Sequence, residues 1–257
     1  MRMHRSCGTL KKVRDAFRKL VRERGLACKR LTVSVKPLTP EEAIGRVKRK
    51  DYPIIRGKER IIEASVLGGK GQAFTDSPAG FSGTLGGVLR LPLNNGRNRA
   101  LVVAAINAAC RALGLASGTV HCKGGDPERC GEKIAEDILS QYGICRVGVV
   151  GFNPAIAAHL VQALGDKNVR ILDLDEANIG KLKFGVRIED GASAAGDMVR
   201  WADIVLATGT TLVNGTVDQL LRGVRKHAKE WRLYGITCAG ASALIGLPRL
   251  CHFGRNY

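Results

Sequence analysis

Residues 145–175 read CRVGVVGFNPAIAAHLVQALGDKNVRILDLD, and this order decides the fold class. An apolar strand over 145–151 is followed by a helix over 154–164 and a second apolar strand over 169–175. The alternation continues with a strand at 202–209, a helix at 216–226, a strand at 231–237 and a short last strand near 250–253. Buried strands that alternate with helices are typical of a parallel, doubly wound sheet. The second half of the chain is therefore predicted to be a Rossmann-like α/β domain.

The first half predicts a smaller α+β domain. A basic helix over 9–24 precedes a strand over 31–38, and Thr39 and Glu42 form the capping box of a helix that begins at Pro40. Two β-type runs, RIIEASVLGG and KGQAFTDSPAGFSG, predict a hairpin at Gly68-Gly69. Residues 98–113 are apolar or small nearly all round and predict a buried helix, central or between domains. We expect one domain over 1–115 and a second over 116–257, which includes a junction segment at 116–144.

Charge and composition narrow the class of protein. The chain is 45% hydrophobic and 25% charged, as a globular protein is, and no apolar run reaches the ~20 residues of a membrane span. No apolar segment follows the basic N-terminal residues, so we expect a cytoplasmic protein without a secretory signal and without a membrane partner.

The net charge of +18 is concentrated near the N-terminus. Residues 1–60 hold 19 Lys and Arg against 6 Asp and Glu. Such a segment can bind nucleic acid, but few aromatic residues accompany it, and a solvated helix face explains it better.

The turn between the first strand and helix of the Rossmann-like half is a candidate ligand site. Gly151 lies in the turn, and Asn153 is predicted to cap the helix beginning at Pro154, whose N-terminus would suit an anion. Asp173 or Asp175 stands where a dinucleotide-binding fold hydrogen-bonds ribose. The turn lacks the other glycines of the dinucleotide fingerprint, so a small anionic ligand or another nucleotide fits better than NAD.

A second candidate is the segment TGTTLVNGT at 208–216, at the carboxyl end of a buried strand. Open α/β sheets bind their ligands at this edge. Thr216 and Gln219 predict a capping box for the following helix, which gives Thr216 a structural role. The better ligand candidates are Thr208, Gly209, Thr210 and Asn214. In the first half, Lys70 and Asp76 would close the crevice if the buried helix brought their loop against the second domain.

The third candidate is HCKGGDPERCG at 121–131, which places two of the eight cysteines beside a histidine. Asp126 is predicted to cap a helix with Pro127 at its first position, so that the helix N-terminus and Arg129 favour the thiolate of Cys130. Cys122 and His121 would add ligands for zinc, iron or copper. A reduced structural pair of cysteines and a redox-active pair are the alternatives.

Five motifs in order, GKGQAFTDSPAGFSG, AAINAACRALG, HCKGGDPERCG, VGVVGFNP and TGTTLVNGT, resemble a family of largely uncharacterised prokaryotic proteins described as heavy-metal-chelation proteins. The resemblance covers about residues 58–257. It implies a small domain resembling the N-terminal domain of enolase, followed by a Rossmann-like domain, with the site between them. No enolase catalytic constellation is present, so the resemblance implies no enolase reaction.

The sequence thus favours a protein that binds a metal or metal complex at the junction of two domains, and it names no catalytic residue. The main alternative is a Rossmann-type enzyme acting on a nucleotide or small anionic metabolite. A nucleic-acid-binding accessory protein is the second alternative, and a homodimer is compatible with each.

Overall fold

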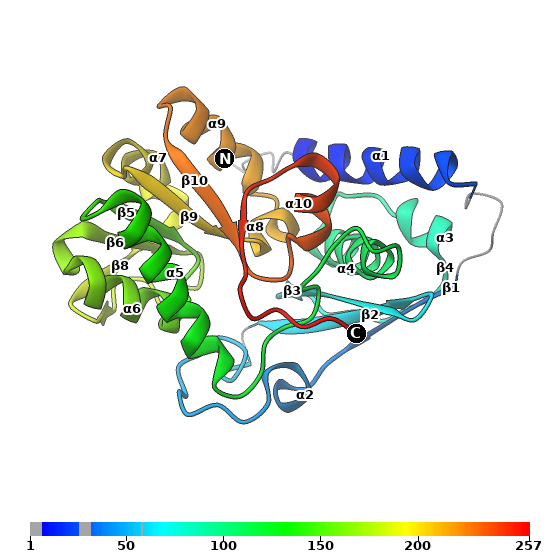
Figure 1. Ribbon diagram of the computed structural model, residues 1–257, viewed down its shortest axis with the longest axis horizontal. Coiled ribbons are helices and arrows are strands. Elements are labelled where there is room, and N and C mark those ends of the chain that lie inside the picture. Colours follow the sequence, from blue (N-terminus) through cyan, green and yellow to red (C-terminus); the bar gives the residue numbers. More distant parts are fainter. Residues whose placement is uncertain (1–6, 26–31, 58) are drawn as a thin grey trace.

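The computed structural model describes residues 7–25, 32–57 and 59–257 and builds them around two β-sheets (Figure 1). Among these residues the smaller sheet is antiparallel, in the order β3-β2-β1-β4. Its strands are β1 (Thr32–Pro37), β2 (Arg60–Val66), β3 (Gly69–Thr75) and β4 (Phe81–Thr84). The larger sheet is formed by β5 (Val147–Val150), β6 (Val169–Asp173), β7 (Leu182–Lys183), β8 (Val186–Asp190), β9 (Ile204–Thr208), β10 (Glu230–Tyr234) and β11 (Arg249–Leu250). The predicted combination of an α+β part and a parallel α/β part is confirmed.

The larger sheet has the order β11-β10-β9-β5-β6-β8-β7, and in the described part of the chain only its edge strand β7 pairs in the antiparallel sense. From β5 onward, without β7, this is the strand order 3-2-1-4-5-6 of doubly wound dinucleotide folds. Helices α5 (Asp126–Tyr142) and α6 (Pro154–Leu164) pack against one face of the sheet. Helices α7 (Gly191–Trp201) and α9 (Val217–Lys226) cover the opposite face, and the short turn η1 (Asp166–Asn168) leads into β6.

The predicted hairpin joins β2 and β3, with Val66 opposite Gly69. Its turn lies one residue earlier than the sequence indicated, at Leu67 and Gly68, which both have a positive φ.

Helix α2 (Pro40–Ile44) begins with the predicted capping box, in which Thr39 accepts from the Glu42 backbone and Glu42 accepts from the Thr39 backbone.

Helix α4 (Gly96–Ala112) is the central element of the smaller unit and is buried along nearly its whole length, as predicted. It lies across β3 so closely that a Cβ on Gly71 would come within 2.1 Å of the backbone nitrogen of Ala108. Figure 1 shows α4 between the antiparallel sheet and helix α1 (Gly8–Glu23), with helices α3 (Leu85–Leu89) and α10 (Ala239–Ile245) nearby.

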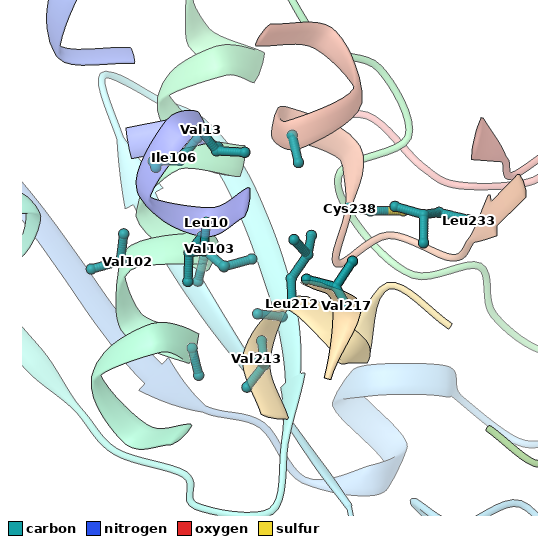
Figure 2. Close-up of a cluster of buried hydrophobic side chains, with 14 of the residues drawn as sticks. Leu10, Val13, Val102, Val103, Ile106, Leu212, Val213, Val217, Leu233 and Cys238 are labelled. Carbon is teal, nitrogen blue, oxygen red and sulfur yellow. The ribbon is translucent and has the colours of Figure 1, made fainter. Parts of the chain in front are cut away.

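The two sheets share one hydrophobic core. In Figure 2, side chains of α1 and α4 pack toward helix α8 (Thr210–Asn214), the start of α9 and β10. The labelled residues are Leu10, Val13, Val102, Val103, Ile106, Leu212, Val213, Val217, Leu233 and Cys238. The N-terminal helix is thus docked against elements of both halves, while the division at residue 115 stays a prediction.

Two predicted helix caps are wrong. The Thr216 side chain does not cap α9, because its hydroxyl donates to Asn214 Oδ1 at 2.8 Å and its backbone already has a helical conformation. Helix α5 begins at Asp126 rather than after it, with Gly125 as the N-cap. The Asp126 carboxylate pairs instead with Arg255, 129 residues along the chain.

Within the described part of the chain, no helix is both long enough and apolar enough to span a bilayer.

Candidate functional site

The carboxyl ends of β5 and β9 lie side by side where the strand order reverses, which is the ligand-binding edge of a doubly wound sheet. Gly151 follows β5 with φ +89°, and a Cβ there would come within 2.6 Å of Thr208 Cγ2. The hydroxyl of buried Tyr234 donates to the Gly151 carbonyl oxygen at 2.7 Å. The space that a dinucleotide fold leaves for phosphate beside such a glycine is therefore occupied by Thr208 and Tyr234.

The polar residues of the first candidate site, in the turn after β5 and at the end of β6, are engaged in local structure. Asn153 caps α6 as predicted, accepting from the backbone of Ala155 and Ile156. Asp173 Oδ1 accepts from the backbone of Leu174, and Asp173 Oδ2 accepts from the buried Asn178 side chain at 2.6 Å. Both carboxylate oxygens of Asp173 are thus already hydrogen-bonded, which leaves little acceptor capacity for a ribose hydroxyl.

The segment expected as a flexible loop after β9 is the short helix α8. Thr208 Oγ1 donates to Thr210 Oγ1 at 3.1 Å, and Asn214 Oδ1 accepts from the backbone and the hydroxyl of Thr216. Thr210 and Gly209 are buried, and a Cβ on Gly209 would lie 2.8 Å from the Cys238 nitrogen. Most of this polar capacity is therefore spent inside the segment.

Carboxylates from both sheets converge at this edge. Glu59, which directly precedes β2, has its pKa raised to about 7 by burial first and then by the charges of Asp173, Asp76 and Asp175. The pKa of Tyr234 is raised by burial and by Asp173 and Glu59. Arg56 lies 3.9 Å from Asp175 and donates to Asn178. We call Glu59, Asp76, Asp173 and Asp175 the acidic group, whose negative charges disfavour an anionic ligand.

Lys70 lies away from the acidic group. It lies at the opposite end of β3 from Asp76, about 20 Å away at ~3.3 Å per residue. Its ammonium pairs with Glu63 Oε1 at 3.2 Å and lies over the Tyr257 ring. The predicted joint closure by Lys70 and Asp76 therefore does not occur.

Three segments that carry cysteines pack together beside the junction. The C-terminal residues run antiparallel to the segment after α4, with Val120 bridged to Arg255 and the Gly118 nitrogen bonded to Asn256. Arg255 and His252 also pair with Asp126 and Asp137 on α5. These contacts bring the segments of Cys122, Cys130 and Cys251 near enough for the three free thiols, which we call the thiol group, to influence one another electrostatically.

The surroundings of Cys122 and Cys130 favour the protonated thiol. Burial raises the pKa of Cys122, with additional contributions from Cys130 and Cys251. The pKa of Cys130 is raised to about 11 by burial and by Cys251, despite backbone hydrogen bonds from His252 and Phe253. The expected activation of Cys130 is wrong, because the thiol is partly buried beside the C-terminal segment and Arg129 lies over the Phe253 ring instead.

His121 lies beside the thiol group as a neutral imidazole. Burial lowers its pKa to about 4. Its Nδ1 lies 2.6 Å from the Cys122 carbonyl oxygen and 3.9 Å from Cys122 Sγ. A ring nitrogen that donates to a backbone carbonyl leaves the other nitrogen as a lone-pair donor, which is the arrangement of many metal-binding histidines.

No three His, Cys, Asp or Glu side chains of the described residues stand close enough together to hold a metal ion as they are. The donor set of the thiol group, sulfur with a neutral imidazole, nevertheless suits soft and borderline metals.

Two residues of these sites escaped sequence reasoning. Cys251 lies near the C-terminus with no motif around it, and Glu59 lies in a charged stretch before β2. Neither has a local signal, because each meets its neighbours only through tertiary packing.

Residues 135–247 match a family model described as "Putative heavy-metal chelation". The match confirms the resemblance inferred from the motifs. The chain is also similar to the crystal structure of a protein of unknown function from this family in Pyrococcus horikoshii, with a TM-score of 0.51 and 17% identity over 89% of this chain and 79% of that chain. A relative from Desulfitobacterium hafniense has a TM-score of 0.48 and 18% identity over 72% of each chain. No curated protein matches. Likeness at this identity shows the fold alone.

Proposed function

From the match of residues 135–247 to the family described as "Putative heavy-metal chelation", we propose that this chain binds a soft or borderline metal ion, or a small complex of one, through the thiol group. Zinc, iron and copper are the metals that the donor set favours. The matched segment ends before Cys251 and begins after Cys130, so the family supports the class of ligand and the packing of this chain supports the residues.

The observation that carries the proposal is the convergence of three free thiols from segments far apart in sequence. Cys130 and Cys251 both raise the pKa of Cys122, and Cys251 also raises the pKa of Cys130. A bound cation reverses this effect, because each thiol loses its proton to solvent and the thiolates then surround a positive charge. Because these side chains do not stand close enough to hold an ion as they are, binding requires the C-terminal segment to move, with His121 as a fourth donor.

Titration of the protein, purified reduced and without an affinity metal, with Cd²⁺ tests this proposal. Thiolate-to-metal charge-transfer absorption that saturates at one ion per chain is expected. The Cys122→Ser, Cys130→Ser, Cys251→Ser variant should lose it, whereas Cys110→Ser should keep it, because Cys110 is buried in the core away from the thiol group. Absence of the band in the wild-type protein would overturn the proposal.

The acidic group supports a second candidate function, the binding of a hard cation or of a positively charged ligand. The raised pKa of Glu59 is the observation in its favour, because clustered carboxylates gain most from a cation. Binding of Mn²⁺ measured by electron paramagnetic resonance would support it, provided that Asp173→Asn removes the binding and the triple serine variant does not. The acidic group also argues against the nucleotide alternative, since its negative charges would repel the phosphates.

A further inference from the structure

Helix α1 presents a basic face to solvent. Its apolar residues Leu10, Val13 and Phe17 are buried in the shared core. The opposite side carries exposed Lys11, Lys12, Lys19 and Arg22. The apolar face is therefore not available to a partner, and what the helix offers is charge.

A neighbouring loop extends this basic face. Arg14 donates to the Leu91 carbonyl at 3.0 Å, and Arg18 donates to the Leu89 carbonyl, so the residues after α3 are held along α1. Exposed Arg90 lies between these two anchored positions, and Arg97 follows in the first turn of α4. We call Lys11, Lys12, Lys19, Arg22, Arg90 and Arg97 the α1 basic surface.

The position of α1 is fixed at its N-terminus by α9. Asp218 accepts from the backbone nitrogens of Gly8 and Thr9 at 2.7 and 2.8 Å and also from the Thr9 hydroxyl. Three further exposed cations lie on α9, namely Arg222, Arg225 and Lys226. Figure 1 shows α1 and α9 along the same edge of the molecule. The charge is therefore carried on rigid, docked helices.

Little of this charge is compensated. Asp15 pairs with Lys11 and Arg18, and Glu23 pairs with Lys19. Among the residues that the structure places, Lys12, Arg22, Arg90, Arg97, Arg222, Arg225 and Lys226 have no carboxylate partner. In the Arg14 side chain, Nε is buried without a hydrogen-bond partner.

The basic stretch after α2 differs from α1, because two of its arginines form ion pairs with carboxylates. Arg49 pairs with Glu128 and lies near Asp51, and Arg56 pairs with Asp175. These residues follow α2, at the opposite side of the molecule from α1 in Figure 1. Of the described cations in residues 1–60, Arg49 and Arg56 are thus held in ion pairs, whereas those of the α1 basic surface face solvent.

The α1 basic surface is charged and has no large exposed apolar side chain, and this composition indicates which kind of partner it binds. None of the exposed large apolar side chains lies on α1, α9 or the loop 89–97, so neither bilayer insertion nor base stacking has a residue to serve it. Helix α1 is about 24 Å long at ~1.5 Å per residue, comparable with about seven base pairs of duplex. We propose that the α1 basic surface binds the phosphate backbone of double-stranded nucleic acid without reading its sequence. This proposal is independent of the metal site.

The test is fluorescence anisotropy with labelled random-sequence duplexes, DNA and RNA, over a series of NaCl concentrations. The wild-type protein should bind with an affinity that falls steeply with salt. A Lys11→Gln, Lys12→Gln, Lys19→Gln, Arg22→Gln variant should lose about tenfold or more in affinity, and its salt slope should fall by about 3.6 if four phosphate contacts are lost at ~0.9 each. Circular dichroism melting shows whether the variant is folded.

The matched control carries the same change of charge elsewhere, at exposed Lys48, Lys167, Lys181 and Arg187, each changed to Gln. It should bind nearly as the wild type does. Equal weakening of both variants would mean that net charge alone drives binding and would overturn the proposal. No duplex binding at low salt, or binding of phosphatidylserine vesicles without duplex binding, would overturn it as well.

Discussion

The side-chain oxygen of Asn107 accepts a 2.7 Å hydrogen bond from the backbone nitrogen of Gly240, which ties α4 directly to the first turn of α10. The amide nitrogen of the same side chain donates to the carbonyl oxygens of Gln72, Ile236 and Thr237. One buried side chain therefore joins the antiparallel sheet, α4 and the segment after β10.

Loss of these bonds should destabilise the whole molecule. We expect Asn107→Ala to lower the free energy of unfolding by about 3 kcal/mol, because several buried backbone groups lose a partner. Asn107→Asp should cost more, since a carboxylate would face three carbonyl oxygens. Urea unfolding measures both, with exposed Asn94→Ala as the control. An Asp variant as stable as the wild type would contradict the assigned hydrogen bonds.

The close approach of α4 to β3 makes a second prediction. Gly71→Ala should lower the free energy of unfolding by about 3 kcal/mol or more. The new Cβ would stand 2.1 Å from the Ala108 nitrogen, and the atoms nearest to it are all backbone atoms, which cannot move aside as a flexible side chain can. Gly125→Ala is the matched control, since its Cβ meets nothing within 4 Å and its φ is −81°. Thermal unfolding of the two variants should separate them clearly, and similar melting temperatures would show that α4 packs differently.

The acidic group makes the free energy of unfolding depend on pH in a specific way. The pKa of Glu59 is raised from 4.5 to about 7 in the folded protein, so its protonated form is favoured there. The resulting stabilisation is complete below about pH 4.5 and is lost as the pH rises through 7. Glu59→Gln should therefore raise the free energy of unfolding at pH 8 by about 1 to 3 kcal/mol relative to the wild type.

The effect of Glu59→Gln should nearly vanish at pH 4, where the wild-type side chain is protonated in both states. Exposed Glu132→Gln serves as the control at both pH values. A stabilisation that is the same at pH 4 and pH 8 would contradict the electrostatic origin.

The Cys130 thiol should react slowly with alkylating reagents. With the pKa of Cys130 at about 11 against an ordinary 9.0, the thiolate fraction at pH 8 is about 100-fold lower than in a free peptide. Iodoacetamide labelling followed by peptide mass spectrometry should show this suppression in the native protein and its loss in urea. Rapid native labelling of Cys130 would restore the activated thiolate that the helix N-terminus indicated.

The contact between Asp218 and the start of α1 predicts a local effect. Asp218→Ala should cost about 2 kcal/mol, because a carboxylate that accepts from the first turn of a helix is lost. Hydrogen exchange should accelerate in α1 more than in α4. Uniform acceleration over the chain, or none, would count against α1 as a separately anchored element.

The sequence by itself determined the local and periodic features of this protein. Apolar runs and helical spacing determined β5, α6 and β6, and the Thr39–Glu42 box and the Asn153 cap formed as predicted because their partners lie within three residues. The resemblance to the matched family followed from motifs in order along the chain, which also needs no tertiary contact.

Tertiary structure decided what the site contains. The Asp126 side chain pairs with Arg255 instead of capping α5. The pKa of Cys130 is raised rather than lowered, because a segment about 120 residues further along the chain shields the thiol from solvent. Cys251 and Glu59 joined their groups only because the sheets pack together, and the buried α4 with its Asn107 sets that packing. The physical reason is the range of the forces: caps and periodicity act within a few residues, whereas desolvation and charge depend on which distant segments the shared core brings together.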